Sequence, residues 1–143
     1  MVTRSDVVLV EERLTRSVIG SFYSVHRALG FGFLEHVYAN ALDVELRSRG
    51  HDVAREFGVT IHYGGIEIAH QRLDMVVDER VVVEIKAGET LHQDATRQLF
   101  NYLRATRLEV GLLLHFGRSA KFRRVICDID HKPFRCGASK TLT

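Results

Sequence analysis

The stretch RLDMVVDERVVVEIK (residues 72–86) predicts an antiparallel hairpin with a three-residue turn at 78–80. Counting outward from that turn sets Asp74 directly opposite Glu84. Opposed side chains on one face of a sheet have Cβ atoms about 4.5 to 5.5 Å apart, where like charges repel each other. A divalent cation would relieve this repulsion, so the register predicts a metal site with Lys86 at its edge.

Alternation along the hairpin separates an apolar face from a polar one. We expect the apolar face to join the core and the polar face to carry the chemistry. A solvated strand face without any site is the alternative that the charges alone leave open. The apolar face is predicted to hold Leu73, Met75, Val77, Val81, Val83 and Ile85, and the other face Arg72, Asp74, Val76, Val82, Glu84 and Lys86.

The rest of the chain predicts helices and strands around this hairpin. Apolar residues at spacings of three and four indicate amphipathic helices, and period-2 alternation or short apolar runs indicate strands. A helix between two strands allows them to pair in parallel, so the sheet is expected to be mixed. We expect helices at 14–29, 34–46 and 92–106, and strands at 53–63, 66–77, 81–86, 110–116 and 123–129.

Composition bounds the class of protein. The 143 residues predict a single domain over 1–143, with a core at about 14–129 and a loose tail at about 132–143. No apolar run approaches the ~20 residues of a membrane span, and the start does not resemble a secretory signal, so a cytoplasmic location is expected. The net charge is only +2, but residues 118–140 hold seven Lys and Arg against two Asp, which favours a local phosphate-facing patch or a solvated edge.

The order of elements and the Asp74…Glu84-x-Lys86 spacing resemble the PD-(D/E)XK nuclease superfamily. Within it, Gly32-x-x-Glu35-x-x-Tyr38 is similar to the motif that names the GxxExxY proteins, and Gln98-x3-Tyr102 follows in the expected order. The resemblance runs from about residue 14 to residue 117. It implies an α/β restriction-endonuclease-like core, in which helices flank a central mixed sheet of four to five strands.

The resemblance also implies roles for individual residues. Lys86 would orient or deprotonate the attacking water. The alternative for Lys86 is an ordinary surface lysine. The alternative for Glu35 is a simple exposed charge, and for Tyr102 it is plain packing in the core. The implied catalytic residues are Asp74, Glu84, Lys86 and Gln98; the implied ligands of Mg²⁺ or Mn²⁺ are Glu35, Asp74, Glu84 and the backbone carbonyl of Ile85; the implied substrate contacts are Tyr38 and Tyr102.

These roles predict a divalent-metal-dependent nuclease that hydrolyses phosphodiester bonds of DNA or RNA. A catalytically silent module of the same fold, binding nucleic acid or protein, is the alternative, and a homodimer would assemble a larger basic surface. An enzyme acting on another phosphoester is a third. Many relatives carry histidine where this chain has Ala95 and asparagine where it has His115, which leaves substrate contacts open.

Overall fold

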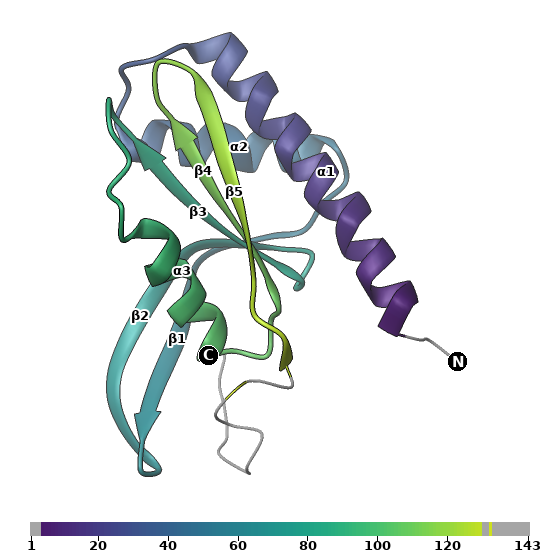
Figure 1. The fold of residues 1–143 in the computed structure, drawn as a ribbon. Coiled ribbons are helices and arrows are strands. Elements are labelled where there is room, and N and C mark those ends of the chain that lie inside the picture. The colour runs from purple at the N-terminus through teal and green to yellow at the C-terminus, as the bar shows by residue number, and fades with distance from the viewer. Residues whose placement is uncertain (1–3, 130–131, 133–143) are drawn as a thin grey trace.

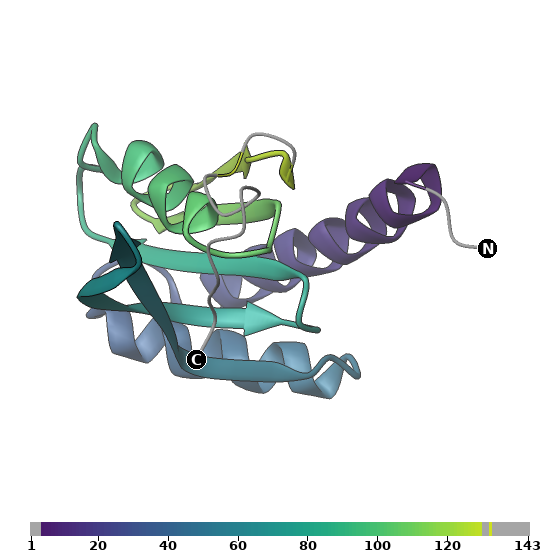
Figure 2. The same ribbon diagram turned by 90° about the horizontal axis from the view of Figure 1, so that it is seen from below.

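A computed structural model describes residues 4–129 and 132, with side chains described from residue 11 onward. These residues form a five-stranded sheet in the order β1-β2-β3-β4-β5, with helices on both faces (Figures 1 and 2). The pairing is antiparallel except between β3 and β4, so the mixed sheet confirms the predicted α/β class. The elements are α1 (Arg4–Leu29), α2 (Glu35–Ser48), β1 (Val53–Tyr63), β2 (Ile66–Val77), β3 (Val81–Ala87), α3 (Ala95–Arg104), β4 (Val110–Phe116) and β5 (Ala120–Ile126).

Helices α1 and α2 cover one face of the sheet. Val18 and Phe22 of α1 and Leu42 of α2 are fully buried in one cluster with Val83 and Leu112 of the sheet. The spacing of these apolar residues by three and four is what sets them on one side of each helix. Most residues of the predicted stripes of both helices are therefore confirmed as core. The prediction for Leu34 was wrong: it precedes the first turn of α2 as its N-cap and is 71% exposed.

Helix α3 covers part of the opposite face. Leu99 and Leu103 form a second cluster with Val82 and Leu113, and α3 connects β3 to β4 in the crossover that a parallel pair requires. Gly111 allows the close approach, because a Cβ there would lie 3.1 Å from the Leu99 side chain. In Figure 1, α3 lies away from the arrowheads of β3 and β4, so that end of the face carries no helix.

The β2–β3 hairpin has the predicted register, with Met75 paired to Val83. Its turn places Asp78 and Glu79 at φ 51° and 58°, a left-handed conformation in which Asp is better tolerated than most residues. The Asp78 carboxylate accepts a hydrogen bond from the Asp52 N–H at 2.8 Å, which ties the turn to the start of β1. This turn sets the register of the β2–β3 pairs that follow it.

One residue of the predicted apolar face lies elsewhere. Met75, like the other four, packs with α1 and α2, whereas Leu73 belongs to the α3-side cluster together with Val59 and Val76. The prediction for Leu73 was wrong. Leu73 lies past the last rung at which β2 pairs with β3, Met75–Val83, and its neighbour strand β1 has a left-handed residue nearby, Glu56 with φ 50°. Strict alternation of faces holds along regular strands, so it does not extend through these positions.

The predicted position of the last strand was also wrong. The strand was expected at 123–129, but β5 runs over Ala120–Ile126. Phe116 pairs directly with Ala120, so only three residues make the turn and the strand begins sooner than its apolar residues indicated.

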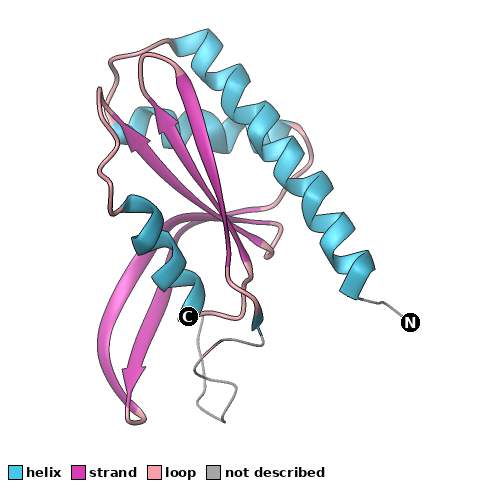
Figure 3. Cartoon of the chain, in the orientation of Figure 1, coloured by secondary structure: helices cyan, strands magenta, loops and turns pink. Residues whose placement is uncertain are grey.

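The β1–β2 hairpin extends past the rest of the sheet, with Tyr63 and Ile66 exposed near its tip (Figure 3).

Of the tail predicted at 132–143, only Lys132 is among the described residues, and its buried ammonium group donates to the carbonyls of Leu103 and Thr106. Residues 133–143 lie outside the described part. None of the described helices is long and apolar enough to cross a membrane.

Candidate metal and catalytic site

The carboxylates of Asp74 and Glu84 lie where strands β2 and β3 stop pairing. The backbone ladder ends at Met75 and Val83. At the next rung the side chains replace backbone acceptors: the Asp74 N–H donates to Glu84 Oε1 at 2.8 Å, and the Ile85 N–H donates to Asp74 Oδ2 at 2.7 Å. Each strand therefore holds the carboxylate of the other, and the two acidic groups lie side by side as the register predicted.

The environment disfavours two negative charges at this position. Glu84 is 7% exposed, and burial, followed by the charge of Asp74, raises the pKa of its carboxyl from 4.5 to about 7. The Asp74 N–H and Lys86 act in the opposite direction, and Glu35 adds a further raising contribution. Because a raised carboxyl pKa reports an unfavourable anion, a cation at this position would be stabilising.

The donor set suits a hard divalent cation. Asp74 Oδ1 and Glu84 Oε2 accept no hydrogen bond from the described residues, and neither carboxylate has a Lys or Arg nitrogen of that part of the chain within 4.0 Å. Mg²⁺ is bound through one or two carboxylates and keeps several waters, so a two-carboxylate site fits it. No three His, Cys, Asp or Glu side chains of the described residues cluster as a ready metal site.

Glu35 is therefore not grouped with the carboxylate pair. It is the first residue of α2, exposed to solvent, and its charge reaches Glu84 only as the weakest of the contributions to the raised pKa. The described structure places it at the N-terminus of α2, near enough for its charge to act on Glu84.

Lys86 lies two residues beyond Glu84 on the same face of β3. It is half-buried, and parallel pairing sets it beside His115 of β4. The alternation of β3 puts Val82, Glu84 and Lys86 on the α3 side of the sheet, where α3 leaves the strand ends uncovered. Ile85 points to the other side and is buried against α1 and α2.

Helix α3 brings Tyr102 to the carboxylates. Its half-buried hydroxyl donates to Gln71 Oε1 at 3.4 Å, and burial, with the charges of Glu84 and Asp74, raises the pKa of the phenol. Gln98, one turn earlier on the helix, is exposed and accordingly free to face a ligand.

Tyr38 occupies a different environment from the substrate contact expected of it. The ring is fully buried and stacks on Phe116 at 4.2 Å between centroids. Its hydroxyl donates to the Gly30 carbonyl at 2.5 Å and accepts from the Phe33 N–H at 3.2 Å. This geometry favours a role in fixing the loop between α1 and α2.

Sequence reasoning did not assign the basic residues beside Lys86. His115 pairs with Lys121, so Lys86, His115 and Lys121 form a row across β3, β4 and β5. Arg123 lies on the same side of β5. The excess of Lys and Arg in residues 118–140 could have indicated them. Because the last strand was predicted at 123–129, its register did not show which of these residues lie on the same face as Lys86.

Comparisons with known proteins agree with this architecture. A family model described as the PD-(D/E)XK nuclease superfamily matches residues 12–125. Among solved structures, the chain is similar to the crystal structure of SSO0001, with a TM-score of 0.52 and 20% sequence identity over 83% of this chain and 60% of that one. The chain thus spans less than two thirds of that protein, and the likeness concerns the fold. No curated protein matches significantly.

Proposed function

This chain belongs to the PD-(D/E)XK nuclease superfamily, and we propose that it is a divalent-metal-dependent nuclease acting on DNA or RNA. The observation that carries the proposal is the Asp74–Glu84 pair. Each carboxylate is fixed by a backbone N–H of the opposite strand, while one oxygen of each remains free of described partners. Two fixed acidic groups with no Lys or Arg nitrogen of the described residues within 4.0 Å are suited to hold a metal.

Asp74 and Glu84 would hold Mg²⁺ or Mn²⁺, with the Ile85 carbonyl as a further ligand and Glu35 binding through water. Such an ion would polarise a phosphoryl oxygen and lower the pKa of a coordinated water. The carboxylates would not need to move to bind the metal, because backbone hydrogen bonds already fix both of them. Rigid ligands of this kind lose little freedom on binding.

Lys86 would act on the attacking water and on the charge that develops at phosphorus. Lys86 lies on the strand that carries Glu84 and on the same face, so its ammonium group would approach the same phosphate. Gln98 would orient the water or Lys86 from the exposed side of α3, and Tyr102, held near both carboxylates, would contact the substrate.

Within the superfamily, we assign the chain to the GxxExxY proteins on the motif Gly32-Phe33-Leu34-Glu35-His36-Val37-Tyr38. The buried Tyr38 gives this motif a structural meaning, since its hydroxyl fixes the loop that presents Glu35. A cytoplasmic location and a homodimer remain predictions.

The proposal is tested with fluorescently labelled single-stranded and duplex DNA and RNA, in Mg²⁺ or Mn²⁺ and again in EDTA. We expect cleavage of at least one substrate with the metal and none with the chelator. Asp74→Ala and Lys86→Ala should each lower kcat at least about 100-fold, since each removes a group that acts in the transition state. Glu67→Ala, which removes an exposed carboxylate from the far end of β2, should cleave normally.

Cleavage that persists in EDTA and in both site variants would contradict the mechanism. A protein that binds nucleic acid but neither binds metal nor cleaves any substrate would instead be the silent module.

A further inference from the structure

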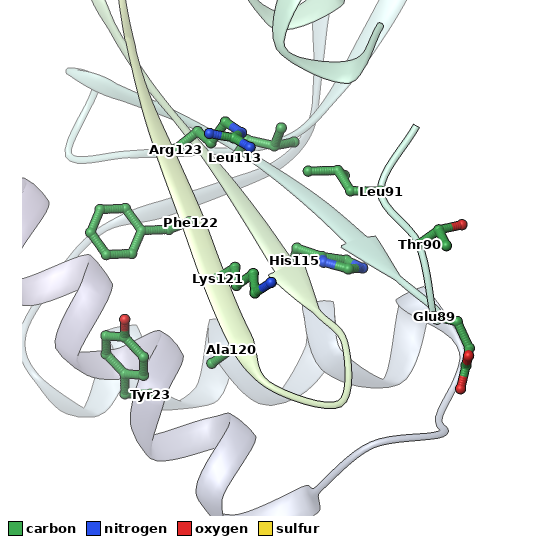
Figure 4. Close-up of a pocket in the computed structure, with 10 residues that line it drawn as sticks. All are labelled: Tyr23, Glu89, Thr90, Leu91, Leu113, His115, Ala120, Lys121, Phe122 and Arg123. Atoms are coloured by element: carbon green, nitrogen blue, oxygen red, sulfur yellow. The ribbon is translucent and has the colours of Figure 1, made fainter. Parts of the chain in front are cut away.

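A groove opens beside the candidate site, at the edge of the sheet formed by β5. It encloses about 610 Å³ and is lined by residues of α1, the β3–α3 loop, β4 and β5 (Figure 4). The lining residues that matter here are Tyr23, His115, Lys121, Phe122 and Arg123. None of them belongs to the metal and catalytic residues proposed above.

The strand register places residues of the groove next to Lys86 of the site. The register pairs Lys86 with His115 and His115 with Lys121, so these three residues form one row. Adjacent strands are about 4.8 Å apart, which puts Lys121 roughly 10 Å from Lys86 in backbone distance. A chain of phosphates that enters at β5 would therefore reach the site along a single face of the sheet.

The cations of the groove lack partners of their own. Lys121 and Arg123 are exposed, and neither forms a hydrogen bond or ion pair with another described residue. Glu89, the acidic residue of the lining, is paired with Arg118, whose Nε donates to it at 2.6 Å. His115 is fixed through Nε2, which donates to the Gly88 carbonyl at 2.9 Å. The groove consequently carries unneutralised positive charge.

Two aromatic rings lie at the same edge. Phe122 of β5 and Tyr23 of α1 are 38% and 39% exposed and contact each other edge to face, with centroids 6.4 Å apart. Alternation places Phe122 on the side of β5 opposite to Lys121, as Figure 4 shows. Cations that face phosphates, next to aromatic rings on which bases stack, are the features of surfaces that bind single strands.

We propose that the groove at the β5 edge binds single-stranded nucleic acid and guides its backbone to the Asp74–Glu84 site. Lys121 and Arg123 contact phosphates, and Phe122 and Tyr23 stack on unpaired bases. This inference names single-stranded nucleic acid as the substrate of the proposed nuclease. It rests on the proposed function, because the bound strand is taken to lead to the Asp74–Glu84 site.

Binding is measured by fluorescence anisotropy with a labelled 20-nucleotide single strand in EDTA, where no cleavage interferes. Lys121→Glu/Arg123→Glu should weaken binding at least about tenfold and reduce the salt dependence, by about 0.7 in log Kd against log salt per lost phosphate contact. Phe122→Ala should weaken it about fivefold or more through lost stacking. The control Arg13→Glu/Arg80→Glu makes the same charge change at exposed positions outside the groove and should bind as the wild type does.

Equal affinity of the groove variant and the control variant would overturn the inference. So would equal affinity of the wild type for a blunt duplex, or displacement of the strand by polyglutamate as readily as by an unlabelled strand.

Hydrolysis of bis(p-nitrophenyl) phosphate separates the two proposals. This small diester needs the metal site but not the groove, so Lys121→Glu/Arg123→Glu should hydrolyse it at the wild-type rate while its KM for oligonucleotides rises at least about tenfold. A wild type that binds single strands but hydrolyses neither substrate would refute the nuclease and leave the groove intact. A variant that loses both hydrolyses equally would refute a separate groove.

Discussion

The two carboxylates at the centre of the fold are held by hydrogen bonds that a regular sheet would give to backbone oxygens. Asp74 and Glu84 exchange acceptors across the β2–β3 gap, so neither can turn away without leaving a backbone N–H unpaired. This arrangement places charge at a partly buried position at the expense of stability. The raised pKa of Glu84 expresses that cost.

The raised pKa makes a prediction about stability in the absence of metal. Between pH 4.5 and about 7 the folded protein binds the Glu84 proton more tightly than the unfolded chain does, so the stability due to this group falls as the pH rises through that window. Glu84→Gln keeps the acceptor for the Asp74 N–H and removes the charge. In EDTA at pH 8 it should stabilise the protein by on the order of 3 kcal/mol, and at pH 5 by less than about 1 kcal/mol.

Thermal unfolding of the wild type and Glu84→Gln at both pH values measures this difference. Glu67→Gln, which changes an exposed carboxylate, is the matched control and should behave as the wild type at both. A Glu84→Gln protein that gains the same stability at pH 5 as at pH 8 would show that burial of the anion is not the cause.

The positions of some single residues could be predicted from the sequence, and those of others could not. The pairing of Asp74 with Glu84 follows from counting outward from the 78–80 turn, because β-strand register is fixed by turn length. The position of Leu73 could not be obtained in this way, since β2 and β3 stop pairing at Met75 and Val83 and the turn no longer fixes the residues beyond that rung. The hydrogen bonds from the backbone to the two carboxylates could not be predicted either. Alternation predicts which face a side chain occupies, but not where two strands separate.

At the level of elements, the loop between α1 and α2 is held by one buried side chain. The Tyr38 hydroxyl bonds both Gly30 and Phe33, and the loop ends at Glu35. Tyr38→Phe should therefore destabilise the protein by about 1 kcal/mol, since two partly buried hydrogen bonds to the backbone are lost. A substrate-binding Tyr38 would instead raise KM without a change in stability.

Urea denaturation, followed by circular dichroism, checks this prediction. Tyr63→Phe removes the hydroxyl of a tyrosine that is 78% exposed on the β1–β2 hairpin and should leave the midpoint unchanged. An unchanged midpoint for Tyr38→Phe would contradict the structural role of the hydroxyl.

Element boundaries followed from the sequence where period and turn residues agreed. The bounds predicted for 53–63, 66–77 and 110–116 match β1, β2 and β4 because alternation or continuous apolarity ends at clear turns. Strand β5 was displaced by three residues because its first half, Ala120–Arg123, faces solvent and carries charge. An edge strand needs few apolar residues, so its hydrophobic pattern is weak.

For the molecule as a whole, the two faces of the sheet divide structure from chemistry. Helices α1 and α2 cover one face completely enough to form the larger core, whereas α3 ends short of the strand ends on the other. The α/β order could be predicted because the crossover rule leaves few topologies for helix–strand patterns. The open groove could not, because it results from how far α3 extends along the sheet, which is set by tertiary packing.

Anomalous diffraction from a crystal grown with Mn²⁺ would reveal a divalent metal between Asp74 and Glu84. We predict an anomalous peak in contact with both carboxylates in the wild type and no peak there in Asp74→Asn, which keeps the shape of the side chain but removes its charge. A wild-type crystal with Mn²⁺ bound elsewhere on the molecule and none between Asp74 and Glu84 would rule out the metal site.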